Sequence, residues 1–283
     1  MNTQQLKAIL ANYGLVPQKR LGQNFLVDQR VSELILKAAA INKRDRVLEV
    51  GAGLGALTKP LAEQAGQILA VEKDRQLIAP LQVQLAGLNN IEIIQADILA
   101  LLQNDSAKVL NFNKVVGNIP YYLSSRLLRV LLESTPKPQL IVLTVQKELA
   151  RRVLAQPPKM NLLAVATQYY ATVELLQSLP KNSFWPQPGV ESAIIRLQPN
   201  AQIIQNSKFK IQNFFTVLRA GFSSPRKKLA GNLKTKLGLE GPVVQQMLKS
   251  CKIDQTVRAE VLNLTQWQQL ARAYATIQQT TNS

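Results

Sequence analysis

The residues best suited to chemistry in this chain are Asn118-Ile119-Pro120-Tyr121. They follow the apolar run Val115-Val116 and precede a helical pattern from Leu123 to Leu132, which predicts a loop at the carboxyl end of a strand. Open α/β sheets bind their ligands at that end. A side-chain amide, backbone carbonyls and an aromatic ring together can hold a planar base and accept hydrogen bonds from its exocyclic amine. The alternative is a turn that only caps the strand.

A glycine-rich loop lies upstream, at Glu49-Val50-Gly51-Ala52-Gly53-Leu54-Gly55. It follows a predicted strand and opens a predicted helix, and glycine allows the backbone to turn tightly and approach a ligand closely. The spacing is G-x-G-x-G, which differs from the G-x-G-x-x-G of dinucleotide sites, and no Gly-Lys-Ser/Thr follows as in a P-loop. The shorter spacing favours a cofactor without a pyrophosphate, such as S-adenosylmethionine.

Two acidic residues follow the next two predicted strands. Glu72 is in the usual position of an acid that accepts both ribose hydroxyls of a nucleoside, and Asp97 can accept a hydrogen bond from an adenine amine. Each has a structural alternative, since Glu72 can neighbour a helix cap and Asp97 can cap the helix that begins at Ile98. The carboxyl ends of parallel strands meet at one edge of a sheet, so these acids, the glycine loop and Asn118 together predict a bound adenosyl cofactor.

The composition narrows the possible chemistry. The chain has 283 residues and no histidine, which excludes a Ser-His-Asp triad, a Cys-His pair and a histidine-ligated metal. Its one cysteine, Cys251, excludes an internal disulfide and a multi-cysteine zinc site, so we expect no metal. Catalysis must therefore depend on positioning and electrostatics, or use Lys, Tyr or a carboxylate.

The formal net charge of +17 indicates a polyanionic partner. Residues 1–199 carry +8 and the much shorter segment 200–283 carries +9, so the basic character is concentrated near the C-terminus. We expect nucleic acid. An anionic membrane surface is the weaker alternative, because no strongly hydrophobic amphipathic face accompanies the charge. No apolar run reaches the length of a membrane helix and no signal-peptide core is present, which predicts a cytoplasmic protein.

Short β-branched runs alternate with helical patterns up to about residue 197, which predicts a mostly parallel sheet covered by helices on both faces. The predicted strands are Arg46–Val50, Ile68–Val71, Ile91–Ile94, Lys114–Val116 and Leu140–Val145. Two further strands, Tyr170–Leu176 and Ala193–Leu197, have little helix between them and predict an antiparallel edge. From Phe209 onward apolar residues recur at helical spacing. We therefore predict an α/β domain over residues 1–199 and a small all-α domain over residues 200–283.

Further motifs carry a resemblance to a known family. They are Gln18-Lys19-Arg20-Leu21-Gly22-Gln23-Asn24-Phe25-Leu26, Gln146-Lys147-Glu148-Leu149-Ala150-Arg151 and Phe184-Trp185-Pro186-Gln187-Pro188-Gly189-Val190-Glu191-Ser192-Ala193. With the glycine loop and Asn118–Tyr121, they make the chain resemble the small-subunit ribosomal RNA adenine dimethyltransferases, the family named for kasugamycin resistance. The resemblance runs from about Pro17 to at least Leu233.

This resemblance implies an α/β, Rossmann-like methyltransferase domain that uses S-adenosylmethionine, followed by a basic helical RNA-binding domain. It implies dimethylation of the N6 of two adjacent adenines in the 3′-terminal hairpin of small-subunit (16S) rRNA. The partner would be an immature 30S subunit during ribosome biogenesis, in the cytoplasm, and a monomer is the simplest oligomeric state.

The resemblance also implies roles for individual residues. Asn24 and Leu26 would cover the methionine side of the cofactor, with Gly51 and Gly53 beneath it, and Asn118 would lie beside the reactive methyl group. Glu72 would hold the ribose and Asp97 the adenine. The chain departs from the family pattern at Ala52, Ile119 and Ala96, and in the basic segment Ser223–Lys228. None of these departures removes a cofactor contact, but the last leaves the RNA contacts open.

The mechanism expected on this basis uses the Asn118 side-chain oxygen and the carbonyl of Ile119 or Pro120 to accept the two hydrogens of the adenine amine. Tyr121 would stack on one face of an extruded adenine and Phe184 on the other, with core packing as the alternative for Phe184. We expect Trp185 in the core. The methylated nitrogen is acidic, so its proton can leave to water without a dedicated base.

Two groups of basic residues are candidates for contact with RNA phosphates. The first is Arg219, Arg226, Lys227, Lys228, Lys234 and Lys236, and the second is Lys19, Arg20, Lys147, Arg151 and Arg152. Three rival functions share part of the pattern: a large-subunit rRNA adenine methylase that confers macrolide resistance, a DNA adenine methylase, and a non-catalytic nucleic-acid-binding relative. The long N-terminal segment, the basic C-terminal helices and the full cofactor set favour the small-subunit enzyme.

Overall fold

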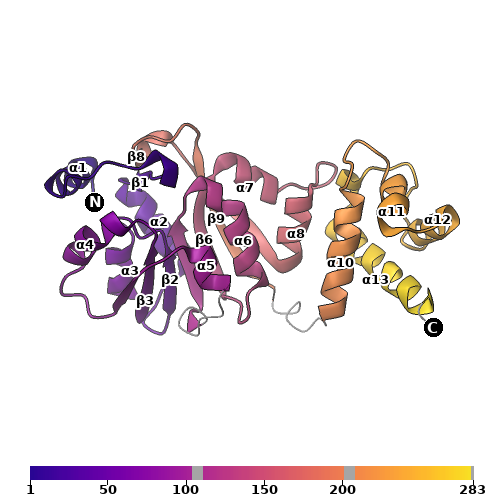
Figure 1. Ribbon diagram of the computed structural model, residues 1–283, viewed down its shortest axis with the longest axis horizontal. Helices are drawn as coiled ribbons and strands as arrows, with labels where there is room; N and C mark the ends of the chain where they lie inside the picture. Colours follow the sequence, from indigo (N-terminus) through magenta and orange to yellow (C-terminus); the bar gives the residue numbers. More distant parts are fainter. Residues whose placement is uncertain (104–110, 201–207, 282–283) are drawn as a thin grey trace. The chain divides into compact units, whose positions relative to one another are not determined.

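The computed structural model describes residues 1–103, 111–200 and 208–281, which form two compact units (Figure 1). The first unit contains Met1–Ala150 and Ala171–Pro199, and the second contains Arg151–Tyr170 and Asn200–Ser283. The predicted boundary at residue 199 differs from this division in one segment, 151–170. That segment packs on the C-terminal helices: the Tyr169 ring stacks on Phe214 with centroids 3.9 Å apart.

Among the described residues, a seven-stranded sheet forms the centre of the first unit, in the order β4-β3-β2-β5-β6-β9-β7. Neighbouring strands from β4 to β6 are parallel, while β9 is antiparallel to both β6 and β7, as the sequence predicts. The strands are β2 (Arg46–Val50), β3 (Gln67–Glu72), β4 (Ile91–Gln95), β5 (Lys114–Asn118), β6 (Leu140–Gln146), β7 (Ala171–Leu179) and β9 (Ser192–Pro199). The predicted α/β class is confirmed.

Helices cover both faces of this sheet. Successive side chains of a strand point to opposite faces, so the unbroken burial of Val47–Val50 in β2 and Ile141–Val145 in β6 requires packing on both sides. One face shares an apolar cluster with α2, α3 and α4. The helices of the first unit are α1 (Thr3–Asn12), α2 (Gln29–Ala39), α3 (Thr58–Gln64), α4 (Arg75–Gln84), α5 (Ile98–Gln103) and α6 (Ser124–Glu133), and α7 (Lys147–Val153) begins in it.

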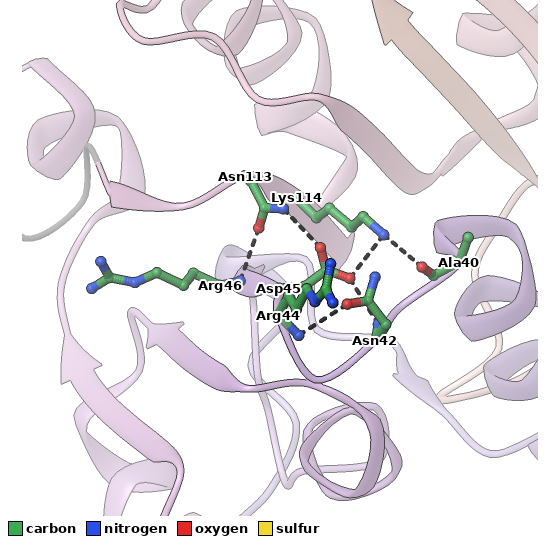
Figure 2. A network of polar contacts seen from close by, with 7 residues as sticks. All are labelled: Ala40, Asn42, Arg44, Asp45, Arg46, Asn113 and Lys114. Atoms are coloured by element: carbon green, nitrogen blue, oxygen red, sulfur yellow. Dashed lines mark hydrogen bonds and ion pairs between the residues drawn. The ribbon is translucent and has the colours of Figure 1, made fainter.

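A polar network fixes the amino ends of β2 and β5, at the edge of the sheet opposite to the predicted site (Figure 2). The buried Lys114 Nζ lies 2.9 Å from Asp45 Oδ2 and donates to the Ala40 carbonyl at 2.6 Å, which ties the end of α2 to the two strands. Asn113 Nδ2 donates to Asp45 Oδ1 at 2.7 Å, and the Asn42 amide donates to Asp45 Oδ2 at 2.7 Å. Every carboxylate oxygen of Asp45 is therefore paired.

A short two-stranded sheet joins β1 (Phe25–Leu26) to β8 (Phe184–Trp185) in antiparallel register. It brings the Gln18–Leu26 motif, which includes η1 (Lys19–Leu21), beside the Phe184–Ala193 motif and η4 (Lys181–Ser183). Sequence patterning does not predict such a pair, because strands of two residues are too short to show a period.

The second unit is helical among its described residues, as predicted. It contains α8 (Leu162–Tyr170), α10 (Lys208–Gly221), α11 (Leu229–Leu237), α12 (Gly241–Ser250), η5 (Ala259–Val261) and α13 (Leu264–Thr281). Its core includes the fully buried Trp267 of α13. A Cβ on Gly221 would lie 2.4 Å from Trp267 Cη2, so only glycine allows α10 and α13 to approach this closely. Phe209, where the predicted helical pattern begins, has no described side-chain placement.

Candidate active site

The predicted site residues come together in one cavity of the first unit, at the carboxyl ends of the parallel strands. Glu72 is the last residue of β3, and Asn118 is the last residue of β5. Gly51 directly follows β2, and Asp97 comes two residues after the end of β4. The predicted residues that line this cavity are Asn24, Leu26, Gly51, Gly53, Glu72, Asp97, Asn118, Pro120 and Tyr121. Phe184 does not line it.

The glycine loop forms the floor of the cavity, where a ligand can approach its backbone closely. Gly51 and Gly53 have φ values of +76° and +58°, a region that side chains disfavour. A Cβ on Gly51 would lie 3.3 Å from the Asn118 carbonyl oxygen, so the loop and the end of β5 are in contact. A Cβ on Gly117 would lie 2.6 Å from the Val50 carbonyl oxygen. Gly117 therefore allows β5 to deliver Asn118 next to the loop.

Glu72 is buried and held by two backbone donors. The Gly53 amide donates to Oε2 and the Asp74 amide donates to Oε1, both at 2.8 Å. Burial raises the pKa of Glu72, although these hydrogen bonds oppose the shift. Each oxygen keeps a lone pair, so the carboxyl can accept further hydrogen bonds from a ligand in the cavity.

Glu49 is a second buried acid in the lining, which the sequence analysis treated only as part of the glycine loop. It is 1 % exposed, and Oε2 has no hydrogen-bond partner among the described residues. Burial, with a smaller contribution from the charge of Glu72, raises the pKa of Glu49 to about 8. Glu49 is therefore protonated at neutral pH.

Asp97 is already engaged on both carboxylate oxygens. Oδ1 accepts from the Leu99 amide at 2.9 Å, which caps α5, and Oδ2 forms an ion pair with Lys73 Nζ at 2.8 Å. The Lys73 ammonium holds the pKa of Asp97 below its usual range. Lys73 itself lines the cavity beside Asp97. A donor from a ligand must therefore share Oδ2 with Lys73 or replace it.

The segment Gln18–Leu26 forms a strap along one side of the cavity, and we use this name for it below. Gln23 Nε2 and Gln18 Nε2 donate to Asp74 Oδ2 at 2.6 and 3.2 Å, which fastens the strap to the start of α4. Asn118 Nδ2 donates to the Asn24 carbonyl at 2.9 Å. This hydrogen bond orients the Asn118 amide and leaves Oδ1 available as an acceptor, because an amide nitrogen can only donate.

The loop after Asn118 is rigidly held. The Pro120 carbonyl accepts from the Leu123 amide at 3.0 Å within η3 (Tyr121–Leu123), whereas the Ile119 carbonyl accepts no hydrogen bond from another described residue. The Ile119 carbonyl is therefore the less engaged of the two expected acceptors, and both remain available to an amine. The Tyr121 hydroxyl lies 2.6 Å from Ser192 Oγ, and this contact fixes its half-buried ring in the cavity wall.

Tyr122 is a lining residue that the sequence analysis missed. It is 58 % exposed, and it lies against Gly22 of the strap, where a Cβ would be 3.6 Å from Tyr122 Cδ1. The signal was present in the sequence as the second of two adjacent tyrosines after Pro120.

Phe184 does not have the position expected of a base-stacking ring. It is 2 % exposed, pairs with Leu26 across the two short strands and belongs to the main apolar cluster of the first unit. This burial favours the alternative of core packing for Phe184. Trp185, expected in the core, is instead partly exposed, with Lys7 Nζ 5.4 Å from its ring centroid.

The basic residues of the two predicted groups differ in their surroundings. The first group is exposed throughout, and within the described part of the chain none of its six members forms an ion pair. In the second group, Lys147 Nζ is paired with Glu191 Oε2 at 2.6 Å, and Arg151 and Arg152 belong to the second unit. Within the described residues, no group of three or more acidic or cysteine side chains could hold a metal ion, and no helix is long and apolar enough to span a membrane.

Comparison with known proteins identifies close relatives. A ribosomal RNA small subunit methyltransferase A from Dehalococcoides mccartyi is 38 % identical over 274 residues, covering 96 % of this chain and 93 % of that protein. The protein of the same name from Leuconostoc mesenteroides is 36 % identical over 283 residues, covering 95 % of this chain and 94 % of that protein. These alignments include both units.

Solved structures show the same fold. A dimethyladenosine transferase from Plasmodium falciparum has a TM-score of 0.72 at 24 % identity, covering 87 % of this chain and 95 % of that one. The 23S rRNA methyltransferase ErmE has a TM-score of 0.70 at 25 % identity, covering 88 % of this chain and 99 % of that one. The family model for ribosomal RNA adenine dimethylase matches residues 16–276. The site geometry, the near full-length relatives and this match lead to one conclusion: the chain belongs to the ribosomal RNA adenine dimethylase family, and it is an S-adenosylmethionine-dependent methyltransferase.

Proposed function

We propose that this protein dimethylates the N6 of two adjacent adenines in the 3′-terminal hairpin of small-subunit rRNA, with S-adenosylmethionine as the methyl donor. The observation that carries the proposal is the orientation of Asn118. Its Nδ2 is committed to the Asn24 carbonyl, so Oδ1 remains to accept a hydrogen from an amine in the cavity. The nearby Ile119 carbonyl supplies a second acceptor.

Two acceptors around one amine explain how the chain activates a weak nucleophile. The lone pair of the adenine N6 is delocalised into the ring. Hydrogen bonds from its two hydrogens to Asn118 Oδ1 and Ile119 O favour a pyramidal nitrogen whose lone pair points into the cavity. Preorganised polar groups of this kind stabilise the transition state, and the loss of one such contact costs about 3 kcal/mol. Alignment of the two reactants contributes as much or more.

The residues around the cavity fit the proposed donor. Glu72 is a buried carboxyl with free lone pairs and suits the ribose hydroxyls, while Gly51 and Gly53 leave room for close backbone approach. Asp97 suits the adenine amine once its Lys73 partner shares or leaves Oδ2. Asn24 and Leu26 of the strap line the same cavity and would cover the methionine side. When bound, S-adenosylmethionine supplies an electrophilic methyl group on a sulfonium.

Aromatic rings at the cavity support base extrusion. Tyr121 is held by Ser192, and its ring is the proposed stacking surface for the flipped adenine. Tyr122, which is exposed at the same place, takes the second aromatic role that Phe184 cannot fill from the core. Base–aromatic stacking is worth roughly 1–3 kcal/mol per base, enough to offset much of the cost of extrusion. The methylated nitrogen loses its proton to water, which is compatible with a chain that contains no histidine.

The exposed basic residues of the second unit support a role in contacting RNA phosphates, as the proposed RNA-binding part of the chain. We propose an immature 30S subunit as the partner, in the cytoplasm, with the protein acting as a monomer. The relatives named for small-subunit RNA support this choice. The likeness in fold to a 23S rRNA methyltransferase keeps large-subunit RNA as the second candidate.

The decisive test replaces Asn118 with alanine. Methyl transfer from labelled S-adenosylmethionine to undermethylated small subunits should fall by about 100-fold or more, as for loss of a preorganised polar contact. Cofactor affinity, measured by calorimetry with S-adenosylhomocysteine, should change little, because Glu72 and the glycine loop are intact and Gln18 and Gln23 still fasten the strap to Asp74. Turnover close to that of the unmodified protein would remove Asn118 from its proposed role.

The substrate is tested with the unmodified protein. Undermethylated small subunits and bare large-subunit RNA are offered in parallel, and modified positions are mapped as reverse-transcription stops. We expect stops at two adjacent adenines near the 3′ end of the small-subunit RNA. Modification confined to the large-subunit RNA would favour the rival methylase.

A further inference from the structure

Helix α1 (Thr3–Asn12) has a position that the proposed function does not explain. It begins with a capping box in which Asn2 and Gln5 exchange side-chain and backbone hydrogen bonds. Leu6 and Leu10 on one side of it are buried, at 1 % and 3 % exposure. The helix lies before residue 16, where the match to the family model begins.

The attachment of α1 to the rest of the unit is apolar. Leu6 and Leu10 form a cluster with Phe25, Leu54 and Leu77, which come from β1, the glycine loop and α4. Across the described residues, every hydrogen bond made by residues 1–15 stays within that segment. The Lys7 ammonium near the Trp185 ring, with Nζ 5.4 Å from the centroid, adds a cation–π contact between α1 and β8. A helix held in this way can leave its place without breaking hydrogen bonds.

The two buried leucines differ in what they contact. Leu6 lines the cavity that contains Glu72 and Asn118, and its cluster partners Phe25, Leu54 and Leu77 line it as well. Leu10 belongs to the same cluster but does not line the cavity. On the other side of α1, Gln5, Ala8 and Ile9 border a separate open groove against α2 and α3. Met1, Leu54 and Ala56 border both spaces, so α1 lies with these three residues between the cavity and the groove.

We propose that α1 is an apolar wall of the S-adenosylmethionine site, and that Leu6 is a cofactor-positioning residue through which docking of the helix and binding of the cofactor are coupled. This inference rests on the proposed cofactor site. Ligand sites combine a mostly apolar lining with a few placed polar groups, and Leu6 extends the apolar part of a lining whose polar part is Glu72, Asp97 and Asn118. The wall also keeps water of the open groove out of the cavity, which strengthens the polar contacts inside it.

The test compares Leu6→Ala with Leu10→Ala. Both remove the same atoms from α1 and from the same cluster, so both loosen the helix to a similar degree, but only Leu6 lines the cavity. Calorimetry with S-adenosylhomocysteine should show affinity lowered roughly tenfold in Leu6→Ala, equivalent to a loss of about 1.4 kcal/mol, and lowered much less in Leu10→Ala. Equal losses, or no loss in Leu6→Ala, would overturn the role of Leu6.

The same comparison separates this inference from the proposed function. If the unmodified protein, Leu10→Ala and Leu6→Ala all bind S-adenosylhomocysteine equally well, the proposed cofactor site is supported, but the role of Leu6 in it is wrong. If the unmodified protein does not bind S-adenosylhomocysteine at all, the cofactor site itself is wrong.

A measurement on the unmodified protein covers the case in which Leu6→Ala fails to fold. Amide hydrogen exchange of residues 3–12 is followed with and without saturating S-adenosylhomocysteine. Because α1 is docked by apolar contacts, the bound ligand should slow exchange in the helix by severalfold. Unchanged exchange in α1, with slowed exchange in residues 51–55, would contradict the coupling.

Discussion

Two neighbouring carboxyl groups in the cavity differ in how the fold accommodates them. Glu72 receives hydrogen bonds from the Gly53 and Asp74 amides, which offset part of the cost of burial, although its pKa is still raised. Glu49 has an oxygen without a partner among the described residues and is protonated at neutral pH, since burial raises its pKa to about 8. The two side chains are therefore suited to different tasks: Glu72 to accepting hydrogen bonds from a ligand, and Glu49 to remaining neutral.

Glu49 makes stability depend on pH. Its pKa in the folded chain lies above that in the unfolded chain, so the folded state binds more protons between about pH 4.5 and 8, and the free energy of unfolding falls as pH rises through that window. Glu49→Gln removes this contribution, while the raised pKa of Glu72 contributes in both proteins. Urea unfolding should show the variant gaining stability relative to the unmodified protein from pH 5 to pH 8, by about 1.4 kcal/mol per pH unit at most. A constant difference across that range would contradict a protonated Glu49.

Tyr121 separates the contribution of a ring from that of a hydroxyl. Tyr121→Phe loses the contact with Ser192 but keeps the stacking surface, so methyl transfer should fall only a few fold. Tyr121→Ala loses the ring, and with it roughly 1–3 kcal/mol of stacking, which corresponds to about 5- to 150-fold in kcat/KM for RNA. Equal loss in both variants would indicate that the hydroxyl, and not the ring, serves catalysis.

Single residues show where sequence reasoning succeeds and where it fails. Glu72, Asp97 and Asn118 were predictable because strand ends are readable from hydrophobic runs, and strand ends meet at one edge of a parallel sheet. Phe184 was assigned to the wrong environment because an aromatic residue beside Pro gives no indication of burial until its pairing with Leu26 is known. The Lys73 ion pair with Asp97 was equally invisible, since it depends on side-chain direction across two loops.

At the scale of elements, the parallel strands are held in place at both ends. The cavity occupies their carboxyl ends, and the network of Asp45, Asn113 and Lys114 joins the amino ends of β2 and β5 to the end of α2. Burial alone would raise the pKa of Asp45, but hydrogen bonds from Lys114, Asn113 and the Asn42 amide outweigh it and hold the pKa below its usual range. The network therefore stabilises the arrangement that delivers Asn118.

Lys114→Met should be strongly destabilising. It leaves the Asp45 carboxylate buried beside an apolar side chain, a loss of about 3–5 kcal/mol for one partner of a buried pair. Arg129→Met is the matched control, because its partner Glu133 lies one turn away on an exposed face, where such pairs contribute about 0.3–0.5 kcal/mol. Urea midpoints measure both. Because the pKa of Asp45 is lowered by folding, the effect is present above about pH 4 and should shrink below it.

Most elements of the first unit follow from the sequence. Arg46–Val50 was predicted with its observed limits, and the antiparallel edge formed by β7 and β9 was predicted from two strands with little helix between them. The β1–β8 pair and α1 were not predicted. Their stability comes from contacts between distant segments, such as Leu26 with Phe184 and Leu6 with Leu77, and local patterning contains no information on those.

At the scale of the whole molecule, positive charge is concentrated in the C-terminal part of the chain. The segment 200–283 carries +9, and its described helices expose Arg219, Lys234 and Lys236 without ion-pair partners among the described residues. The predicted domain boundary and the two compact units differ over residues 151–170, where the apolar helix α8 gives no indication in the sequence of the unit to which it belongs. In the structure, α8 packs on α10 and α13, and the Tyr169 ring stacks on Phe214.

The exposed charges predict steep salt dependence of RNA binding. Each phosphate contact removed should lower the slope of log K against log salt by about 0.7–0.9. The double variant Lys234→Gln/Lys236→Gln should therefore reduce the slope by roughly one to two, whereas Lys37→Gln/Lys59→Gln in the first unit serves as a charge-matched control. Binding to small-subunit RNA is measured by filter retention from about 50 to 300 mM KCl, a range of salt concentration over which affinities that depend on phosphate contacts change strongly. Equal slopes in the two double variants would exclude this surface.

The hydrogen bond from Asn118 to the Asn24 carbonyl has a consequence for the order of events in a catalytic cycle. In the proposed mechanism, the Asn118 amide that accepts the substrate amine takes its orientation from the strap, and the strap would also cover the donor. If the strap is displaced, the hydrogen bond to the Asn24 carbonyl is lost, and Asn118 Oδ1 is no longer oriented as an acceptor. The site therefore accepts the RNA base only after the strap has closed over S-adenosylmethionine. This favours ordered binding, with the methyl donor first and the RNA second.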